Sequence, residues 1–285
     1  MIFWIASYPK SGNTWLRTLI SSYYYSKDGI YDNSIIKKIG QFPEKRHFNK
    51  FEYDQNVVTD TSRLWLKAQE NINKDNQLRF FKTHNVFGSL NNQKFTNRQN
   101  SIGCIYIVRD PRNVITSLKN HYEMNDEQAL KWMANEKQFI YDVQNLEKDG
   151  YSDFQFISSW ETNYKSWTVQ KQIPFMIVKY ESLLKETYVV FKDIVEFINK
   201  TTGINNKINK ERLKNSVQST SFNKLKENEK KHGFSEAILS KKTNEKIPFF
   251  FLGPENDWKK ILNDEQAKKL TNIFEKNLKE FSYTK

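Results

Sequence analysis

The chain has 285 residues, enough for one large domain or two small ones with a sizeable hydrophobic core. An apolar fraction of 38% and an aromatic fraction of 15% are typical of a globular protein. The formal net charge of +12 indicates a protein that attracts anions, such as nucleotides, nucleic acid, anionic glycans or acidic lipid headgroups. Because many lysines lie in Lys- and Asn-rich stretches, the charge alone does not choose among these partners.

The single cysteine and the short apolar runs exclude two further classes. Cys104 is alone, which excludes an intramolecular disulfide framework and is typical of a reducing compartment. It lies inside the apolar run SIGCIYIV, which predicts a buried thiol rather than a nucleophile. No signal-peptide pattern is present, and no run approaches the ~18 apolar residues that span a bilayer. We therefore expect a cytoplasmic protein with no membrane span.

Short apolar runs predict four strands, which are unbroken rather than alternating, as in strands covered on both faces. Amphipathic stripes predict helices over 15–24, 115–122, 157–167 and 267–278. Buried strands that alternate with amphipathic helices predict an α/β fold of three layers with a central parallel sheet. Ligands of such sheets lie at the carboxyl ends of the strands. The predicted strands are 2–6, 78–82, 102–108 and 173–179.

Two segments do not follow this alternation. Residues 28–76 carry aromatic side chains without a period, and residues 205–247 are mostly polar and charged. Both are candidates for irregular, mobile covers over a site. A disordered basic loop is the alternative for the second segment.

The first predicted strand is followed by the loop YPKSGNTW, residues 8–15. A loop at this place points free backbone N–H groups and the positive end of a helix at a ligand. The pattern predicts an anion cradle with phosphate as its usual occupant; a capped helix start with a surface lysine is the alternative. The ATP-loop pattern G-x-x-x-x-G-K-[ST] is absent, which disfavours a Mg-nucleoside triphosphate. The cradle residues are Lys10, Ser11, Gly12, Asn13 and Thr14.

The second motif, FFKTHNVFG, ends the second predicted strand. His84 lies just past the strand end, and Lys82 lies two residues before it. Histidine exchanges a proton near neutral pH and is a natural general base for a hydroxyl nucleophile. The alternative is a structural or exposed histidine, which is what we expect for His47, His121 and His232.

The third motif, VRDPRNVITSLKNHY, follows the third predicted strand. Arg109 lies at the carboxyl end of that strand, Pro111 ends it, and Ser117 lies about two turns into the next helix. A guanidinium and a hydroxyl on one such unit can grip a phosphate. The alternative is Arg109 in a structural ion pair. Two anion sites at neighbouring strand ends suit a ligand with two separated phosphates.

These three motifs, in this order, resemble those of the sulfotransferases that use 3'-phosphoadenosine 5'-phosphosulfate (PAPS). The segments STSFNKLKENE and FFFLGPENDWKKIL are similar to two later motifs of that family, so the resemblance covers nearly the whole chain. It implies one domain over residues 1–285 with a nucleotide-kinase-like, P-loop-like architecture. It also implies transfer of the sulfuryl group from PAPS to an acceptor hydroxyl.

The resemblance implies a role for each catalytic group. The loop from Lys10 to Thr14 would bind the 5'-phosphosulfate, with Lys10 neutralising charge on the bridging oxygen. His84 would deprotonate the acceptor, and Lys82 would stabilise the sulfuryl group in flight. Sulfuryl transfer, like phosphoryl transfer, depends on alignment and charge stabilisation, so we expect catalysis without a metal.

The resemblance also implies a nucleotide site. Arg109 and Ser117 would hold the 3'-phosphate, and Trp15 would stack on the adenine. The remaining residues near the nucleotide would be Tyr180, Thr220, Phe222 and Gly253.

The chain departs from the family pattern at two places. Asn13 stands where many members have Thr. Phe251 and Leu252 precede Gly253, where the family often has Arg-Lys as further ligands of the 3'-phosphate, and Asn256 replaces a second Gly. The lysines that could substitute for the missing pair are Lys246, Lys259 and Lys260.

Two other functions remain open from the sequence. One is a nucleotide-dependent phosphotransferase, and the other is a non-catalytic binder of nucleic acid or another polyanion, although no nucleic-acid motif is present. The acceptor is open as well. Aromatic residues around the site permit a phenol, steroid or lipid, lysines permit a sugar, and a protein tyrosine is a further candidate. The segments expected to bind it are 28–76, 85–100, 130–170 and 225–247.

Overall fold

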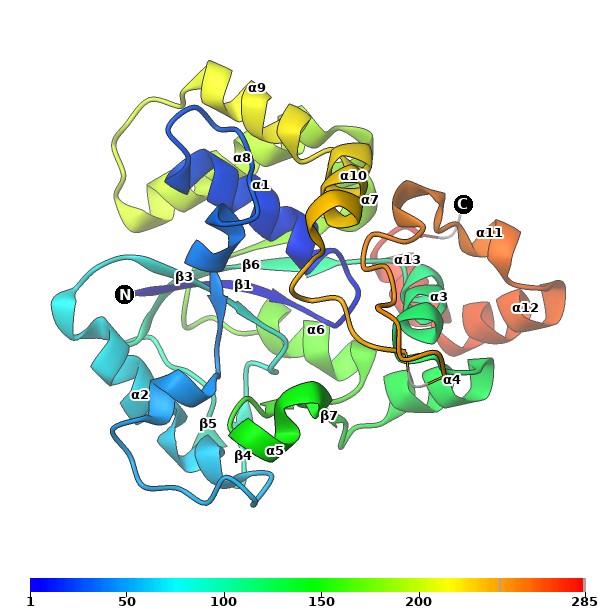
Figure 1. The fold of residues 1–285 in the computed structure, drawn as a ribbon, viewed down its shortest axis with the longest axis horizontal. Coiled ribbons are helices and arrows are strands. Elements are labelled where there is room, and N and C mark those ends of the chain that lie inside the picture. The colour runs from blue at the N-terminus through cyan, green and yellow to red at the C-terminus, as the bar shows by residue number, and fades with distance from the viewer. Residues whose placement is uncertain (241, 284–285) are drawn as a thin grey trace.

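A computed structural model describes residues 1–240 and 242–283, which are built around a five-stranded parallel sheet (Figure 1). All neighbouring strands run parallel, so their carboxyl ends meet at one edge of the sheet. The predicted sheet is confirmed, and the four predicted strands end within two residues of the observed ones. The strand order is β2 (Gly40–Gln41), β3 (Arg79–Thr83), β1 (Ile2–Ser7), β6 (Ser101–Val108) and β9 (Phe175–Lys179).

Two hydrophobic cores lie on the two faces of the sheet. Alternate side chains of β1 point to opposite cores: Trp4 packs in one, and Phe3 and Ile5 pack in the other. The first core holds apolar residues of α2, α3, α4, α6, α12 and α13, and the second holds those of α1, α7, α8 and α9. These helices form layers on both sides of the sheet (Figure 1), which confirms the three-layer α/β/α prediction. Cys104 is buried in β6, as predicted.

The observed helices follow the predicted stripes with two differences. α6 begins at Trp160 rather than at Ile157, because the Ser159 side chain caps it by accepting a hydrogen bond from the backbone N–H of Thr162. The last predicted helix is two helices, separated at Phe274. The helices so far named are α1 (Asn13–Tyr25), α2 (Trp65–Ile72), α3 (Pro111–Tyr122), α4 (Asp126–Ala134), α6 (Trp160–Thr168), α7 (Tyr180–Lys185), α8 (Thr187–Thr202), α9 (Lys210–Ser219), α12 (Asp264–Ile273) and α13 (Glu275–Glu280).

The smaller elements decorate this framework. β4 pairs with β5, and β7 pairs with β8, each as a short antiparallel ladder. The remaining helices and strands are β4 (Ser89–Leu90), β5 (Gln93–Lys94), β7 (Phe139–Ile140), β8 (Gln155–Phe156), α5 (Leu146–Asp149), α10 (Phe222–His232) and α11 (Trp258–Ile261). Short 3-10 helices cover Ile35–Lys38, Lys45–Phe48, Asp60–Leu64, Asn73–Asp75, Val143–Asn145 and Gly253–Glu255.

Regular structure extends into the two segments that the sequence predicted to be irregular. Residues 28–76 contribute β2 and α2, and residues 205–247 contribute α9 and α10. α9 and α10 are mostly polar helices. Each buries one apolar side chain, Leu213 in α9 and Leu225 in α10, so each packs against the protein through a narrow apolar stripe. An apolar stripe this narrow is not visible in a lysine-rich sequence.

The chain after α10 crosses the carboxyl edge of the sheet. We call residues 233–240 and 242–248 the strap. Figure 1 shows it passing in front of the loop that joins β1 to α1. The strap lies against the predicted anion cradle, because Glu236 of the strap accepts a hydrogen bond from Thr14.

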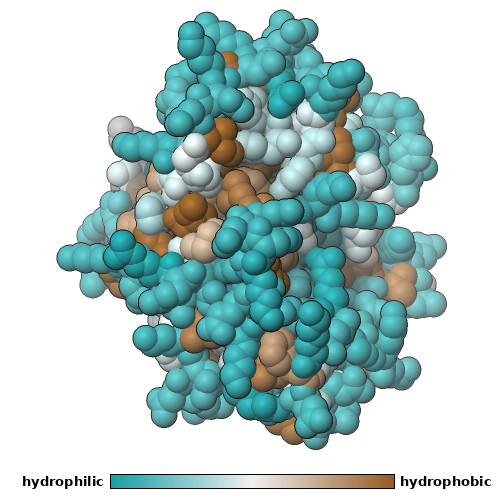
Figure 2. Space-filling view, turned by 90° about the vertical axis from the view of Figure 1, so that its left-hand side faces the viewer, coloured by the Kyte–Doolittle hydropathy of each residue, from teal (hydrophilic) through white to brown (hydrophobic). Residues whose placement is uncertain are grey.

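The surface fits the high charge of the sequence. Figure 2 shows a face that is mainly hydrophilic, on which apolar side chains form small separate groups. Within the described part of the chain, none of the helices combines the length and the apolar character needed to cross a membrane.

Candidate active site

The loop between β1 and α1 turns sharply through two left-handed residues. Lys10 has φ 65° and Gly12 has φ +99°. A β-carbon at Gly12 would stand 2.5 Å from Cδ2 of Tyr180, so only glycine fits this turn and this contact. The hydroxyl of Ser11 is buried and has no hydrogen-bond partner among the described residues. A buried unpaired hydroxyl beside a helix N-terminus supports a polar ligand at this loop.

The Asn13 side chain ties the loop to β1. Its amide nitrogen Nδ2 donates to the carbonyl oxygen of Ile5 at 3.0 Å and to Oγ of Ser7 at 3.2 Å. The sequence departure from Thr at this position thus gives the loop a brace to the strand beneath it. Thr14, the next residue, uses its hydroxyl differently, because Oγ1 donates to a carboxylate oxygen of Glu236 in the strap at 2.8 Å.

His84 is held in one orientation just past the end of β3. Its Nδ1 lies 2.7 Å from the carbonyl oxygen of Ser7, and a carbonyl can only accept, so Nδ1 carries the proton. Burial and then the positive charge of Lys82 lower the pKa of His84 to about 3. The imidazole is therefore neutral at pH 7, with the lone pair on Nε2. This is the tautomer that a general base requires.

The backbone around His84 is fixed as well. Its N–H donates to Oε1 of Gln155 at 2.7 Å, and its carbonyl accepts from Nδ2 of Asn163 at 2.9 Å. These contacts hold the backbone of His84 in place, and the contact of Nδ1 with the Ser7 carbonyl holds the ring. The structure thus places a rigid histidine beside the end of β1, where the cradle begins.

Lys82 and two residues that the sequence did not reveal form a charged cluster at the end of β3. Nζ of Lys82 lies 3.2 Å from Oε1 of Glu236, and Nη1 of Arg17 lies 2.5 Å from the same oxygen. Burial lowers the pKa of Lys82. Arg17 follows Thr14 by three residues on α1, a spacing that puts both side chains on one helix face. That spacing is the signal by which Arg17 could have been found.

Lys10 lies under the end of the strap. Its Nζ is 4.4 Å from the centre of the Phe249 ring, a cation–π contact. Burial is the largest cause that lowers the pKa of Lys10, to about 7; Glu236 opposes this shift, and the positive charges of Lys82 and Arg109 add to it. Lys10 thus titrates near neutral pH.

The predicted nucleotide residues come together on the other side of the loop. The guanidinium carbon of Arg109 lies 4.2 Å from the centre of the Tyr180 ring, and Nη1 donates to the Lys10 carbonyl at 3.2 Å. Trp15 meets Tyr180 edge to face at 5.7 Å between ring centres. The indole N–H of Trp15 donates to the carbonyl of Thr220 at 3.0 Å, which fixes its plane.

Phe222 and Gly253 touch at the far side of this group. A β-carbon on Gly253 would stand 2.1 Å from Cε2 of Phe222. Asn256, which replaces a family glycine, holds the Gly253 turn on α3: its Nδ2 donates to the Asn113 carbonyl at 2.9 Å, and its Oδ1 accepts from Thr116 at 2.5 Å.

The residues that replace the family's Arg-Lys pair, and the side chains that could take its place, differ in how exposed they are and in what they contact. Ser117 follows Thr116 on α3 and is partly buried. Phe251 is 45% exposed. Lys246 lines a cavity beside α3, and Lys259 lies 5.7 Å from the ring centre of Trp258.

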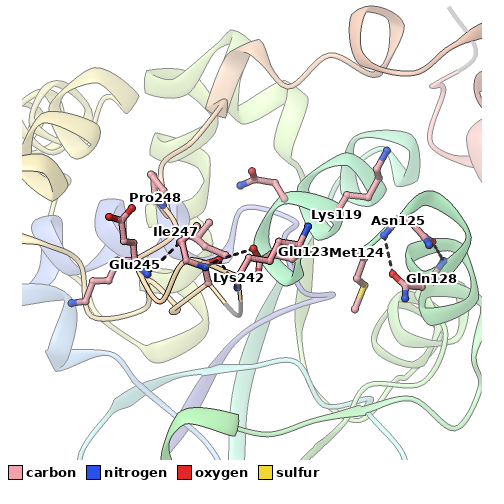
Figure 3. Close-up of a pocket in the computed structure, with 13 residues that line it drawn as sticks. Lys119, Glu123, Met124, Asn125, Gln128, Lys242, Glu245, Ile247 and Pro248 are labelled. Atoms are coloured by element: carbon pink, nitrogen blue, oxygen red, sulfur yellow. Dashed lines mark hydrogen bonds between the residues drawn. The ribbon is translucent and has the colours of Figure 1, made fainter.

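A cavity of about 730 Å³ lies between α3, α4 and the strap (Figure 3). In Figure 3, Lys119, Asn125 and Gln128 form one side, and strap residues form the other. It lies next to the site in the chain, because Pro248 in its lining is followed by Phe249, whose ring contacts Lys10. Most of the lining is polar: Lys119, Asn120, Glu123, Met124, Asn125, Gln128, Ser240, Lys242, Thr243, Glu245, Lys246, Ile247 and Pro248.

The positive charge of the site is carried by side chains. Lys10 lies in the cradle, and Lys82, Arg17 and Arg109 lie around it. Among residues 1–240 and 242–283, no three His, Cys, Asp or Glu side chains are grouped so that they could hold a metal ion.

Comparisons with known proteins identify the family of the chain. A family model described as "Sulfotransferase domain" matches residues 2–282. The luciferin sulfotransferase of Photinus pyralis is 27% identical over 235 residues, which are 79% of this chain and 56% of that relative. Sulfotransferase 1A1 of Rattus norvegicus is 23% identical over 276 residues, 96% of this chain and 83% of that relative.

A solved structure supports the fold. A mouse sulfotransferase crystallised with 3'-phosphoadenosine 5'-phosphate (PAP) matches 98% of this chain and 84% of its own, with a TM-score of 0.59 and 20% identity. This likeness confirms the predicted P-loop-like architecture.

Proposed function

The chain belongs to the sulfotransferase family of PAPS-dependent enzymes, and on that premise we propose that it moves the sulfuryl group of PAPS to an acceptor hydroxyl with His84 as general base. The observation that carries the proposal is the contact of His84 Nδ1 with the Ser7 carbonyl at 2.7 Å. This contact leaves Nε2 free to accept a proton beside Lys82. His84 and Lys82 lie at the end of β3, which pairs with β1, and the loop that contains Lys10 follows β1.

The proposed step is an in-line displacement at sulfur. The acceptor oxygen forms the new bond to sulfur as the bond from sulfur to the bridging oxygen breaks, and PAP leaves with the electron pair. Nε2 of His84 takes the acceptor proton. Lys10 neutralises the bridging oxygen, and Lys82 stabilises the sulfuryl oxygens in flight. Such transfer depends on alignment and on fixed charges rather than on covalent intermediates.

The donor would lie along the carboxyl edge of β1 and β6. The backbone and side chains from Lys10 to Thr14 bind the 5'-phosphosulfate, and Arg109 with Ser117 binds the 3'-phosphate. Trp15 provides one face of the adenine pocket. The other nucleotide contacts are Tyr180, Thr220, Phe222 and Gly253. Since these groups come from all parts of the sequence and converge on one sheet, residues 1–285 form one domain in this proposed function.

The acceptor is proposed to be a hydroxyl-bearing small molecule, lipid or sugar. The cavity beside the strap is lined by Pro248, the residue before Phe249, whose ring contacts Lys10, so it is a suitable approach to the reaction centre (Figure 3). Its lysine, amide and hydroxyl side chains favour a polar, sugar-like acceptor over a steroid, because a mostly polar lining offers a steroid little apolar surface to contact. A cytoplasmic location is part of the proposal and is supported by the single buried thiol of Cys104.

Titration calorimetry with PAP, against adenosine 5'-phosphate as control, tests the donor site. We expect PAP to bind at least tenfold more tightly, because only PAP carries the 3'-phosphate that Arg109 and Ser117 would hold. Equal affinity for the two nucleotides would reject the proposal. Labelled PAPS with separate mixtures of sugars, phenols and steroids then identifies the acceptor class by which mixture gains label.

A further inference from the structure

Glu236 reaches from the strap into the cluster at the end of β3. One carboxylate oxygen lies 2.5 Å from Nη1 of Arg17 and 3.2 Å from Nζ of Lys82, and the other accepts from Oγ1 of Thr14 at 2.8 Å. Two of these partners come from α1, which begins in the cradle, and Lys82 comes from β3, which pairs with β1. The Glu236 side chain is 24% exposed, and that of Arg17 is 5% exposed.

The Glu236 carboxylate is ionised in this cluster. Burial alone would raise the pKa of Glu236, but the charges of Arg17 and Lys82 and the hydrogen bonds from Arg17 and Thr14 outweigh burial and hold the pKa well below its usual value. If one member of a buried cluster of charges is removed, the remaining charges are left unpaired in a place that water reaches poorly. The position of the strap is therefore coupled to the positions of Lys82 and Thr14.

Arg17 makes this contact rigid. Its Nη2 donates to the carbonyl of Ile39 at 2.9 Å, just before β2. The Arg17 guanidinium is thus fixed, and it cannot move with the Glu236 carboxylate if the strap moves away from the sheet. The strap is held at its other end by Glu229, which accepts from the backbone N–H groups of Phe249 at 2.7 Å and Phe250 at 2.9 Å.

We propose that Glu236 is a positioning residue, which latches the strap over the donor loop and aims Lys82 and Thr14 at the transferring sulfuryl group. This inference rests on the proposed function. Without the carboxylate, Lys82 and Arg17 would repel each other, and the Lys82 side chain would turn toward solvent. The negative charge of Glu236 thus allows the positively charged Lys82 and Arg17 to lie side by side near the sulfuryl group that is transferred.

Glu236→Gln tests this inference, and Glu227→Gln is the matched control variant. Glu227 lies on α10 in an exposed pair with Lys231, so its variant removes the same charge without touching the site. We expect Glu236→Gln to lower kcat about tenfold or more and to raise the KM for PAPS. Affinity for PAP, which lacks the sulfuryl group near Lys82, should change less than about threefold. Glu227→Gln should match the unmodified protein in all three measurements.

Two results would overturn the inference. One is Glu236→Gln with unchanged kcat and unchanged KM. The other is tighter PAP binding at unchanged kcat, which would make Glu236 an anion that competes with the donor for Thr14 and Lys82.

Arg17→Lys is a second variant if Glu236→Gln does not fold. It keeps the charge but loses the rigid link to Ile39. A several-fold lower kcat with retained PAP affinity is expected, and unchanged kcat would contradict the latch. Failure of the unmodified protein to bind PAP or to use PAPS would instead reject the proposed function, so the two failures are distinguishable.

Discussion

The ring of Phe222 occupies the place where any side chain at Gly253 would have to stand. A β-carbon there would lie 2.1 Å from Cε2 of the ring, and Gly253 also has a left-handed φ of +52°. Phe222 is proposed to border the adenine. Because Gly253 has no side chain, it leaves the space that the Phe222 ring needs in this position.

Gly253→Ala should therefore weaken nucleotide binding. We expect about a tenfold higher Kd for PAP by calorimetry, about 1.4 kcal/mol, because the Phe222 ring must move. Gly203→Ala is the matched control: Gly203 has φ +74° and no atom within 4 Å of the added carbon. It should lose roughly 1 kcal/mol of stability to backbone strain and keep its PAP affinity. Equal affinities of the two variants would show that the contact is unimportant.

The pKa of Lys10, about 7, predicts an alkaline loss of activity. Lys10 is charged below this pKa and neutral above it, so kcat/KM for PAPS should fall about tenfold per pH unit as pH rises above about 7. The limb in kcat should lie at higher pH, because the bound donor's negative charge stabilises the ammonium. Lys10→Arg keeps its charge and should lack the limb. A flat profile of the unmodified protein to pH 9 would contradict this assignment.

Loss of the His84 side chain should affect the chemical step and spare donor binding. We expect His84→Ala to lower kcat by about 10²-fold or more, the usual contribution of a positioned base. PAP affinity should stay within about twofold, because no donor contact is assigned to the ring. His232→Ala, at an exposed position at the end of α10, serves as control. Full activity of His84→Ala with a good acceptor would remove the histidine from the mechanism.

Two histidines besides His84 have lowered pKa values and should make the fold sensitive to acid. Burial is the largest cause that lowers the pKa of His47 to about 3 and that of His121 to about 2. The unfolded chain binds a proton at each below about pH 6.5, and the folded chain does not, so stability falls as pH decreases.

Urea unfolding between pH 6.5 and 5 measures this effect. Each histidine should contribute a loss of up to about 1.4 kcal/mol per pH unit. His47→Asn places an acceptor near the original Nδ1, which accepts from the backbone N–H of Glu44 at 3.0 Å, and it should make the slope shallower. An unchanged slope would mean that His47 is protonated in the folded protein.

The sequence predicted those parts of the site that lie at strand ends. Lys10, His84 and Arg109 each follow an unbroken apolar run, and parallel strands bring such positions to one edge. Glu236 was missed because its partners are more than 150 residues away, and an acid in a lysine-rich segment carries no periodic signal. β2 was missed because two residues are too few to form a pattern.

The position of β1 has a consequence for how the chain is made. β1 lies between β3 and β6, and all six of its residues are buried, yet both partners come later in the sequence. At about 5–20 residues per second, the roughly 70 residues before β3 take on the order of ten seconds to synthesise. During that time the strand IFWIAS has no sheet to join. A nascent chain stopped before Arg79 should therefore cross-link to a chaperone, and one extended past Val108 on the ribosome should release it.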